Sequence, residues 1–217
     1  MKQWLAIFLS LAMILAVTAC GTARPDNGPE SEPEQSESGP RPNTESKADS
    51  AEESAETKGR SLVVYFSWSG NTKRVAQSIQ QQTGSDIFEI VPKTPYSTDY
   101  NTLVDDAKLE QQKKARPEIS TDIDNIADYD TIYVGFPNWW GDMPMILYTF
   151  FDTYDLSGKT VALFCTSGGS GLSNTVNEVK ALEPNAEVVQ GLHIGSGASA
   201  NPDSAVRSWL DEIGTAR

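Results

Sequence analysis

The chain alternates short apolar runs with longer segments whose apolar positions recur at helical spacing. The apolar runs are rich in β-branched and aromatic residues, which favours strands buried on both faces of a parallel sheet. We predict strands at residues 61–66, 87–91, 131–136 and 160–165, and a last one within 187–194. We predict helices at residues 72–83, 100–115, 145–154, 172–182 and 202–213.

Regular alternation of strand and helix predicts an α/β fold with three layers and a doubly wound, five-stranded parallel sheet. The reason is that each βαβ crossover places its helix on a face of the sheet. Ligands of such folds bind outside the carboxyl ends of the strands. The loops that follow the first, third and fourth strands are therefore the candidates for a binding site.

The N-terminus has the pattern of an export signal. The uncharged apolar stretch from Trp4 to Val17 is short for a membrane span and suits a signal-peptide core. The following Val-Thr-Ala-Cys resembles the lipobox of bacterial lipoproteins. That resemblance implies a signal peptide at 1–19 and a lipid on Cys20; a secretory signal that happens to contain a cysteine is the alternative.

The segment from residue 21 to 60 has a different composition. It is rich in Ser, Glu and Pro, contains no aromatic residue, and carries ten acidic against five basic residues. Such a segment cannot bury enough apolar surface to offset the entropy cost of ordering. We predict that 20–60 is a lipidated Cys20 followed by a disordered acidic linker; a binding tail is the alternative.

The remaining residues, 61–217, have the length of one domain. They contain twenty acidic and eleven basic residues, within a chain of net charge −13. This surface disfavours nucleic acid and anionic membranes as direct partners. Its single cysteine, Cys165, lies in an apolar strand and is expected in the core. His193 is the only histidine, so we predict no histidine-based metal site.

The first strand is followed by Ser67-Trp68-Ser69-Gly70-Asn71-Thr72. At the start of a helix several backbone N–H groups lack helical partners and the positive end of the helix dipole faces outward. Hydroxyl groups add donors, and a glycine lets the backbone approach closely. This segment can therefore enclose a phosphate without lysine or arginine. The alternative is an ordinary Ser/Gly turn that caps a helix.

The third strand ends in Pro137-Asn138-Trp139-Trp140-Gly141, and the fourth in Thr166-Ser167-Gly168-Gly169-Ser170-Gly171. Adjacent tryptophans cannot both enter one core, because successive side chains point apart. We expect at least one to be exposed or to press on something flat; a hydrophobic clamp within the protein is the alternative. The glycines would let the last loop direct N–H groups at a ligand.

These loops carry a resemblance to a known family. The first matches every position of the flavodoxin phosphate loop, Thr/Ser-x-Thr/Ser-Gly-Asn-Thr. Together with the Gly-x-Pro-x-Trp-Trp-Gly pattern of the second, it makes residues 61–217 similar to a bacterial subgroup of flavodoxin-like flavoproteins. The resemblance implies strand order 2-1-3-4-5 and non-covalently bound FMN.

The resemblance also implies a set of cofactor-binding residues. They are Ser67, Trp68, Ser69, Gly70, Asn71, Thr72, Pro137, Asn138, Trp139, Trp140, Gly141, Thr166, Ser167, Gly168, Gly169 and Gly171. No side chain need act as an acid or base, because the flavin does the chemistry. The peptide at Gly141 is expected to tune the redox potentials of the flavin.

The function implied is electron transfer at the outer face of the cytoplasmic membrane, with redox proteins or quinones as partners. The spacing of Pro137, Gly141 and Met143 is also similar to that of flavin-dependent NAD(P)H:quinone oxidoreductases. A quinone or flavin reductase is therefore the alternative. A flavin-free surface-binding lipoprotein is a third interpretation, because one fold can host unrelated functions.

Overall fold

The computed structural model describes residues 59–215, which form an α/β fold around a parallel sheet. The strand order is β2-β1-β3-β4-β5, with β6 also paired to β4, so the expected order is confirmed. The strands are β1 (Ser61–Tyr65), β2 (Asp86–Glu89), β3 (Thr131–Pro137), β4 (Thr160–Ser167), β5 (Glu187–Val188) and β6 (Leu192–Gly195).

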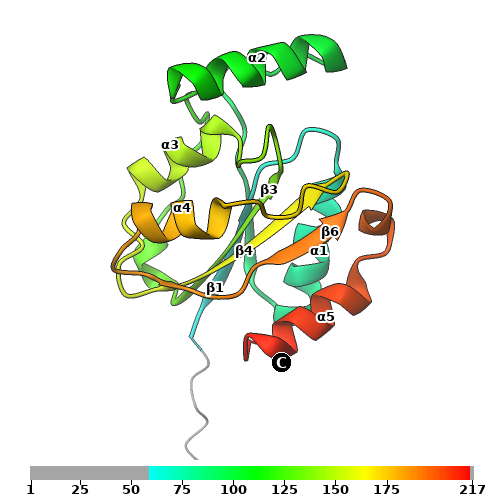
Figure 1. Ribbon diagram of the computed structural model, residues 1–217. Helices are drawn as coiled ribbons and strands as arrows, with labels where there is room; N and C mark the ends of the chain where they lie inside the picture. The colour runs from blue at the N-terminus through cyan, green and yellow to red at the C-terminus, as the bar shows by residue number, and fades with distance from the viewer. Residues whose placement is uncertain (1–58, 216–217) are drawn as a thin grey trace, which may run out of the picture. The chain divides into compact units, whose positions relative to one another are not determined.

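Helices cover both faces of the sheet (Figure 1). They are α1 (Asn71–Thr83), α2 (Tyr100–Lys113), α3 (Met145–Thr153), α4 (Thr175–Leu182) and α5 (Asp203–Glu212), with two short 3₁₀ turns, η1 (Ile126–Asp128) and η2 (Ala198–Ala200). Helices α1 and α5 lie on one face, α3 and α4 lie on the other, and α2 crosses above the carboxyl ends of the strands. Within residues 59–215 no helix combines the length and the apolar character that a membrane span requires.

Two hydrophobic cores hold the layers together, because successive strand residues point to opposite faces. The core on the α3 side contains Val64, Val134, Leu163 and Phe150. The core on the α1 and α5 side contains Val63, Tyr133, Phe164, Val75 and Trp209. Each predicted strand of the sheet centre is thus buried on both sides, and the loops at its carboxyl ends rest on a close-packed base.

The last strand differs from the prediction, because it is interrupted. Residues 189–191 separate β5 from β6, although both pair with β4. The carbonyl of Gln190 accepts a hydrogen bond from Trp209 Nε1 at 2.8 Å instead of joining the ladder. Contact with α5 therefore divides a segment that the sequence pattern presents as one strand.

The helix predicted to begin at residue 172 begins at Thr175. Ser173 has a φ of 51°, in the left-handed region, which a continuing right-handed helix cannot accommodate. Its hydroxyl donates to the carbonyl of Ser170 at 3.2 Å. The first residues of the predicted helix are consequently part of the loop after β4.

Candidate functional site

The segment between β1 and α1 leaves backbone donors free at the start of the helix. Gly70 is the N-cap, with a φ of 82°, and no side chain caps the helix. Within the described residues nothing accepts a hydrogen bond from the N–H groups of Asn71 or Thr72, whereas Lys73 N donates to Ser67 Oγ at 3.3 Å. The first turn also contains no acidic residue. These are the properties of an anion site at a helix N-terminus.

The start of α1 is tied to the end of β4 by a buried pair of hydroxyls. Thr72 Oγ1 and Thr166 Oγ1 lie 2.9 Å apart, and both residues are almost fully buried. The side chain of Thr166 is thus used inside the protein, and not at the surface of the loop. It positions the helix N-terminus relative to the central strand.

The predicted loop at 166–171 starts later than the pattern suggests, because β4 continues through Ser167. Ser167 Oγ accepts hydrogen bonds from the N–H groups of Gly169 and Gly171, both at 3.2 Å, and pairs with His193 Nε2 at 2.9 Å. His193 is therefore satisfied locally, in a strand at the edge of this loop. The N–H groups of Gly168 and Ser170 remain as the donors that this loop can offer to a ligand, because Ser167 already engages the other two.

The loop after β3 is a tight hairpin. Trp139 and Asp142 exchange both backbone hydrogen bonds, at 2.8 and 3.1 Å, and the two residues between them have positive φ angles of 55° (Trp140) and 81° (Gly141). This is the geometry of a two-residue primed turn. Glycine adopts it freely, but a tryptophan there is costly and persists only where its surroundings hold it.

The two tryptophans separate, as the alternation argument predicts. Trp139 turns inward, and its ring meets Phe66 and Tyr96 edge-on at centroid distances of 5.5 and 5.2 Å. Trp140 points outward and is 51% exposed. The clamp interpretation thus describes Trp139, while the expectation of an exposed tryptophan is confirmed by Trp140.

Helix α2 holds Trp140 in its strained conformation through three contacts. Trp140 Nε1 donates to the carbonyl of Val104 at 3.0 Å, and Lys108 Nζ lies 4.7 Å from the centre of a Trp140 ring. Gln111 Nε2 donates to the Trp140 carbonyl at 3.4 Å. All three contacting groups belong to α2, and the sequence around Trp140 does not indicate that this helix will be its neighbour.

Beneath α2 lies a hollow of ≈ 250 Å³. It is lined by Tyr100, Leu103, Val104, Ala107, Asn138, Trp139 and Trp140. The lining is mainly apolar and includes no charged side chain, which suits a flat uncharged ring. The sequence pattern identifies Leu103, Val104, Ala107 and Leu109 as the apolar positions of this helix, but nothing in it shows that the first three line a site.

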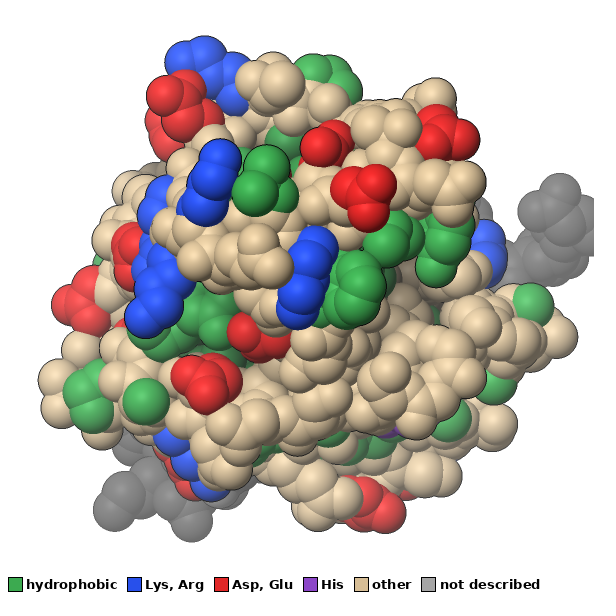
Figure 2. Space-filling view, turned by 45° about the horizontal axis from the view of Figure 1, so that its top comes forward, with side chains coloured by type: hydrophobic (Ala, Val, Ile, Leu, Met, Phe, Trp, Pro, Cys, Tyr) green, Lys and Arg blue, Asp and Glu red, His purple; other side chains and the backbone are tan. Residues whose placement is uncertain are grey.

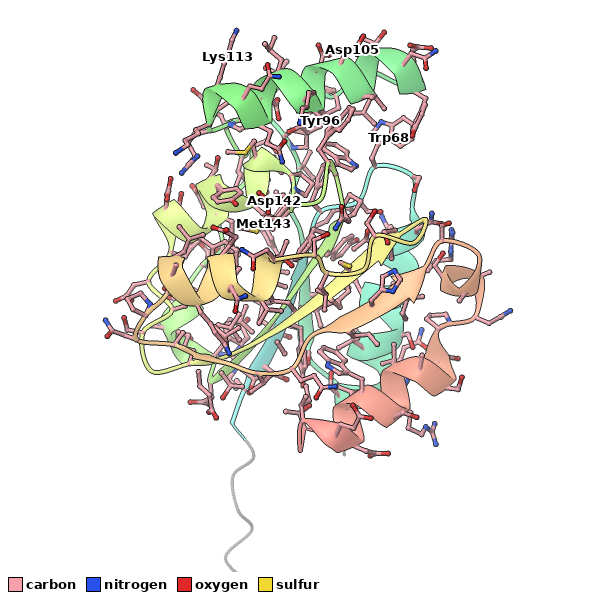
Figure 3. All side chains as sticks on the ribbon, in the orientation of Figure 1. Trp68, Tyr96, Asp105, Lys113, Asp142 and Met143 are labelled. Atoms are coloured by element: carbon pink, nitrogen blue, oxygen red, sulfur yellow. The ribbon has the colours of Figure 1, made fainter. Side chains whose placement is uncertain are left out.

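Trp68, from the phosphate-loop segment, lies close to the same hollow. Its ring centroid lies 6.2 Å from that of Tyr100, and its Nε1 donates to the carbonyl of Ser97 at 2.9 Å. Figure 3 shows Trp68 and Tyr96 beneath α2, with Asp105 and Lys113 on the helix above them. The anion site and the apolar hollow are therefore neighbours at one edge of the sheet.

Asn138 joins the second and third loops. Its Nδ2 donates to the carbonyl of Gly171 at 2.9 Å and to Ser173 Oγ at 3.0 Å, and its Oδ1 accepts from Gly141 N at 3.0 Å. The contact between Thr72 and Thr166 joins the first segment to the third, so all three predicted site segments come together. Among the predicted residues, Pro137 is only partly exposed, because it ends β3 in register with Thr166.

Three acidic groups lie near these loops, of which Cys165 is buried and Asp142 and Glu110 are partly buried. Burial raises the pKa of the Asp142 carboxyl, which accepts from Tyr148 OH at 2.8 Å, and also raises the pKa of Glu110, which accepts from Tyr96 OH at 3.0 Å. Burial raises the pKa of the Cys165 thiol to about 12, so the thiol is protonated at neutral pH. Cys165 is the core residue that the sequence predicts.

Charges on the surface around α2 are mixed in sign. Figure 2 shows Lys and Arg side chains interspersed with Asp and Glu, and with hydrophobic side chains between them. Five ion pairs occur among the described residues, and all are largely exposed. Such pairs contribute little stability, typically about 0–1 kcal/mol each.

Comparisons with known proteins identify relatives of this fold. The chain is 34% identical to a protein from Bacteroides eggerthii described as a flavoprotein, over 71% of this chain and 98% of that one, with a TM-score of 0.64. It is 32% identical to a flavoprotein from Bacteroides uniformis, over 70% of this chain and 98% of that one, with a TM-score of 0.64. It is 27% identical to a Lactobacillus acidophilus flavoprotein whose structure is a complex with FMN, over 67% of this chain and 99% of that one, with a TM-score of 0.55.

No curated protein matches the chain. A family model described as "Flavodoxin" matches residues 60–213, which is nearly all of the described part and well over half of the chain. The fold, the strand order and the free N–H groups at the start of α1 agree with that match. The chain belongs to the flavodoxin family.

Proposed function

We propose that this protein binds FMN non-covalently and acts in electron transfer. The observation that supports this best is the adjacency of two matched features: free backbone donors at the start of α1 and an apolar hollow beneath α2. A flavin mononucleotide has the same two parts, a phosphate and a flat ring. The Lactobacillus relative, in complex with FMN, adds independent support.

Each part of the site has a defined task in this proposal. The N–H groups of Asn71 and Thr72, with the hydroxyls of Ser67 and Ser69, would take the phosphate. The hairpin at Trp140 and Gly141 and the N–H groups of Gly168 and Ser170 would frame the ring. Bound FMN would supply the capacity to exchange electrons; the protein positions it and excludes water.

The predictions for residues 1–58 lie outside the described residues and are proposed on the sequence alone. Of the predicted linker only Gly59 and Arg60 are described, and Arg60 pairs with Asp86 and Asp128 of the domain. A lipid on Cys20 and a linker to residue 60 would place the domain at the outer face of the cytoplasmic membrane. Nicotinamide donors are scarce there, so membrane redox proteins or quinols would supply the electrons. This location favours a carrier over an NAD(P)H-dependent reductase.

An absorbance spectrum of the purified full chain, with and without added FMN, tests the proposal, followed by titration with dithionite. Flavin bands that survive desalting, with reduction in two resolved one-electron steps, are expected. Bound flavin reduced in a single two-electron step, with steady NADH oxidation, would instead indicate a reductase. A protein that retains no flavin and gains no thermal stability from FMN would overturn the proposal in favour of a flavin-free binding protein.

A further inference from the structure

Arg74, in the first turn of α1, lies beside the phosphate loop. Its Nη1 is 3.6 Å from the position that a Cβ on Gly70 would occupy. The guanidinium therefore lies next to the residue at which the loop turns into the helix. From the sequence we expect only hydroxyls and N–H groups to meet a phosphate here, so this cation is an additional feature of the structure.

Two neutral acceptors hold the guanidinium in this place. Arg74 Nη2 donates to Asn71 Oδ1, and Nε donates to the carbonyl of Ser199 at 3.3 Å. Ser199 belongs to η2, which packs against the start of α1 (Figure 1). An arginine has five N–H donors. Both donors on Nη1 and one on Nη2 thus remain for another acceptor, on the side of the loop.

The neighbouring cation behaves differently. Lys73 Nζ pairs with Glu89 Oε2 at 2.8 Å, so an acidic side chain of β2 balances its charge. Arg74 forms no ion pair with any carboxylate in residues 59–215. Two adjacent residues of one helical turn therefore carry the same charge, but only Arg74 is both uncompensated and directed at the loop.

We infer that Arg74 binds the terminal phosphate of the flavin and makes the site selective for FMN over riboflavin. The inference rests on the proposed function, whose cofactor it concerns. A phosphate monoester carries close to two negative charges at neutral pH. The surrounding domain, with twenty acidic and eleven basic residues, repels such a group. A guanidinium with free, forked donors offsets that repulsion and matches the phosphate geometry.

The test compares Arg74→Gln with Lys73→Gln in the full chain, by titrating the flavin-free protein with FMN and with riboflavin and following flavin fluorescence. Arg74→Gln should raise the Kd for FMN about tenfold and leave the Kd for riboflavin unchanged. Lys73→Gln, which removes the same charge one residue away, should change neither Kd by more than about twofold. Arg74→Lys, which keeps the charge without the fork, should lie between wild type and Arg74→Gln.

Salt adds a second measurement. Wild-type affinity for FMN should fall with ionic strength more steeply than that of Arg74→Gln, because a charge–charge contact is screened. Equal losses for FMN and riboflavin in Arg74→Gln would overturn the inference, as would equal effects of the two Gln variants. A wild-type protein that prefers neither flavin would overturn the selectivity alone, and one that binds neither flavin would overturn the proposed function as well.

Discussion

The phosphate loop and the hollow beneath α2 lie at the same edge of the sheet, but they are built in different ways. The loop is one continuous segment, residues 67–72, and its donors are mainly backbone groups. The hollow combines α2 with the hairpin after β3, and side-chain contacts such as Trp140 to Val104 hold the two together. The comparison teaches that a site made from backbone can be recognised locally, whereas one made from side chains depends on packing.

The two regions also differ in how firmly they are attached. Helix α1, which follows the loop, buries Val75, Ala76 and Ile79 completely against the sheet. Helix α2 buries only Leu103 and Ala107, and its Leu109 is 47% exposed. Segments with little buried apolar surface open locally at low free-energy cost. We therefore expect α2 to open more readily than the phosphate loop.

The largest effect is expected at the phosphate loop. Gly70→Val places a β-branched side chain at a φ of 82°, a conformation that costs about 1–3 kcal/mol. The loop would relieve this strain by turning its N–H groups away from the phosphate, and the Kd for FMN should rise about thirtyfold. Isothermal titration calorimetry with FMN measures this change.

Gly197→Ala is the matched control, because nothing lies within 4 Å of an added Cβ there, its φ is −70°, and it is not among the proposed cofactor-binding residues. It should bind FMN within about threefold of wild type. If Gly70→Val bound FMN as tightly as this control, FMN binding would not depend on the backbone conformation of the phosphate loop. The loop would then not differ from the hollow in being built from backbone donors.

A smaller, local effect is expected at the hollow. Trp140→Ala removes the hydrogen bond to the Val104 carbonyl and the contact with Lys108, which together contribute about 1–2 kcal/mol to the attachment of α2. Amide hydrogen exchange across residues 100–113 should become about tenfold faster, while exchange in α1 stays unchanged.

Lys113→Ala is the control for this variant, because Lys113 lies on α2 but makes no side-chain hydrogen bond or ion pair within residues 59–215. It should leave the exchange of α2 nearly as in wild type. Unchanged exchange in Trp140→Ala would mean that Leu103 and Ala107 suffice to hold the helix.

The smallest effect is a pH dependence beneath α2. Burial raises the pKa of Glu110 above its ordinary value of 4.5, and the nearby Asp106 acts in the same direction. The folded state therefore binds this proton more tightly than the unfolded state, so the stabilisation is complete below pH 4.5 and is lost as pH rises through the folded-state pKa. Relative to Glu110→Gln, wild type should lose less than about 1 kcal/mol over that rise, since water screens a half-exposed group.

Urea unfolding at several pH values measures this difference. Glu118→Gln provides a control of opposite sign, because Lys93 lowers the pKa of the exposed Glu118 carboxyl. Wild type should gain stability over that variant as pH rises through the ordinary range of a glutamate. The same slope in both variants would show that burial beneath α2 does not govern the titration of Glu110.

Much of the fold and part of the site follow from amino-acid pattern. The apolar runs predict the strands, and alternation with helices predicts the three layers, because a buried parallel strand needs apolar residues on both faces. The phosphate loop can also be recognised from the sequence, because its donors are backbone groups placed by the junction of strand and helix. The strand order rests on family resemblance, and the structure confirms it.

Contacts between distant segments decided the remainder. The last strand is divided because Trp209 engages the Gln190 carbonyl, and α2 covers the site because Trp140 reaches Val104. Arg74 gains its place from Ser199, 125 residues away along the chain. Local pattern records which residues prefer a strand, a turn or a helix, but it carries no information on which remote side chain will meet them. Only the close packing of the whole domain decides which distant side chains come into contact.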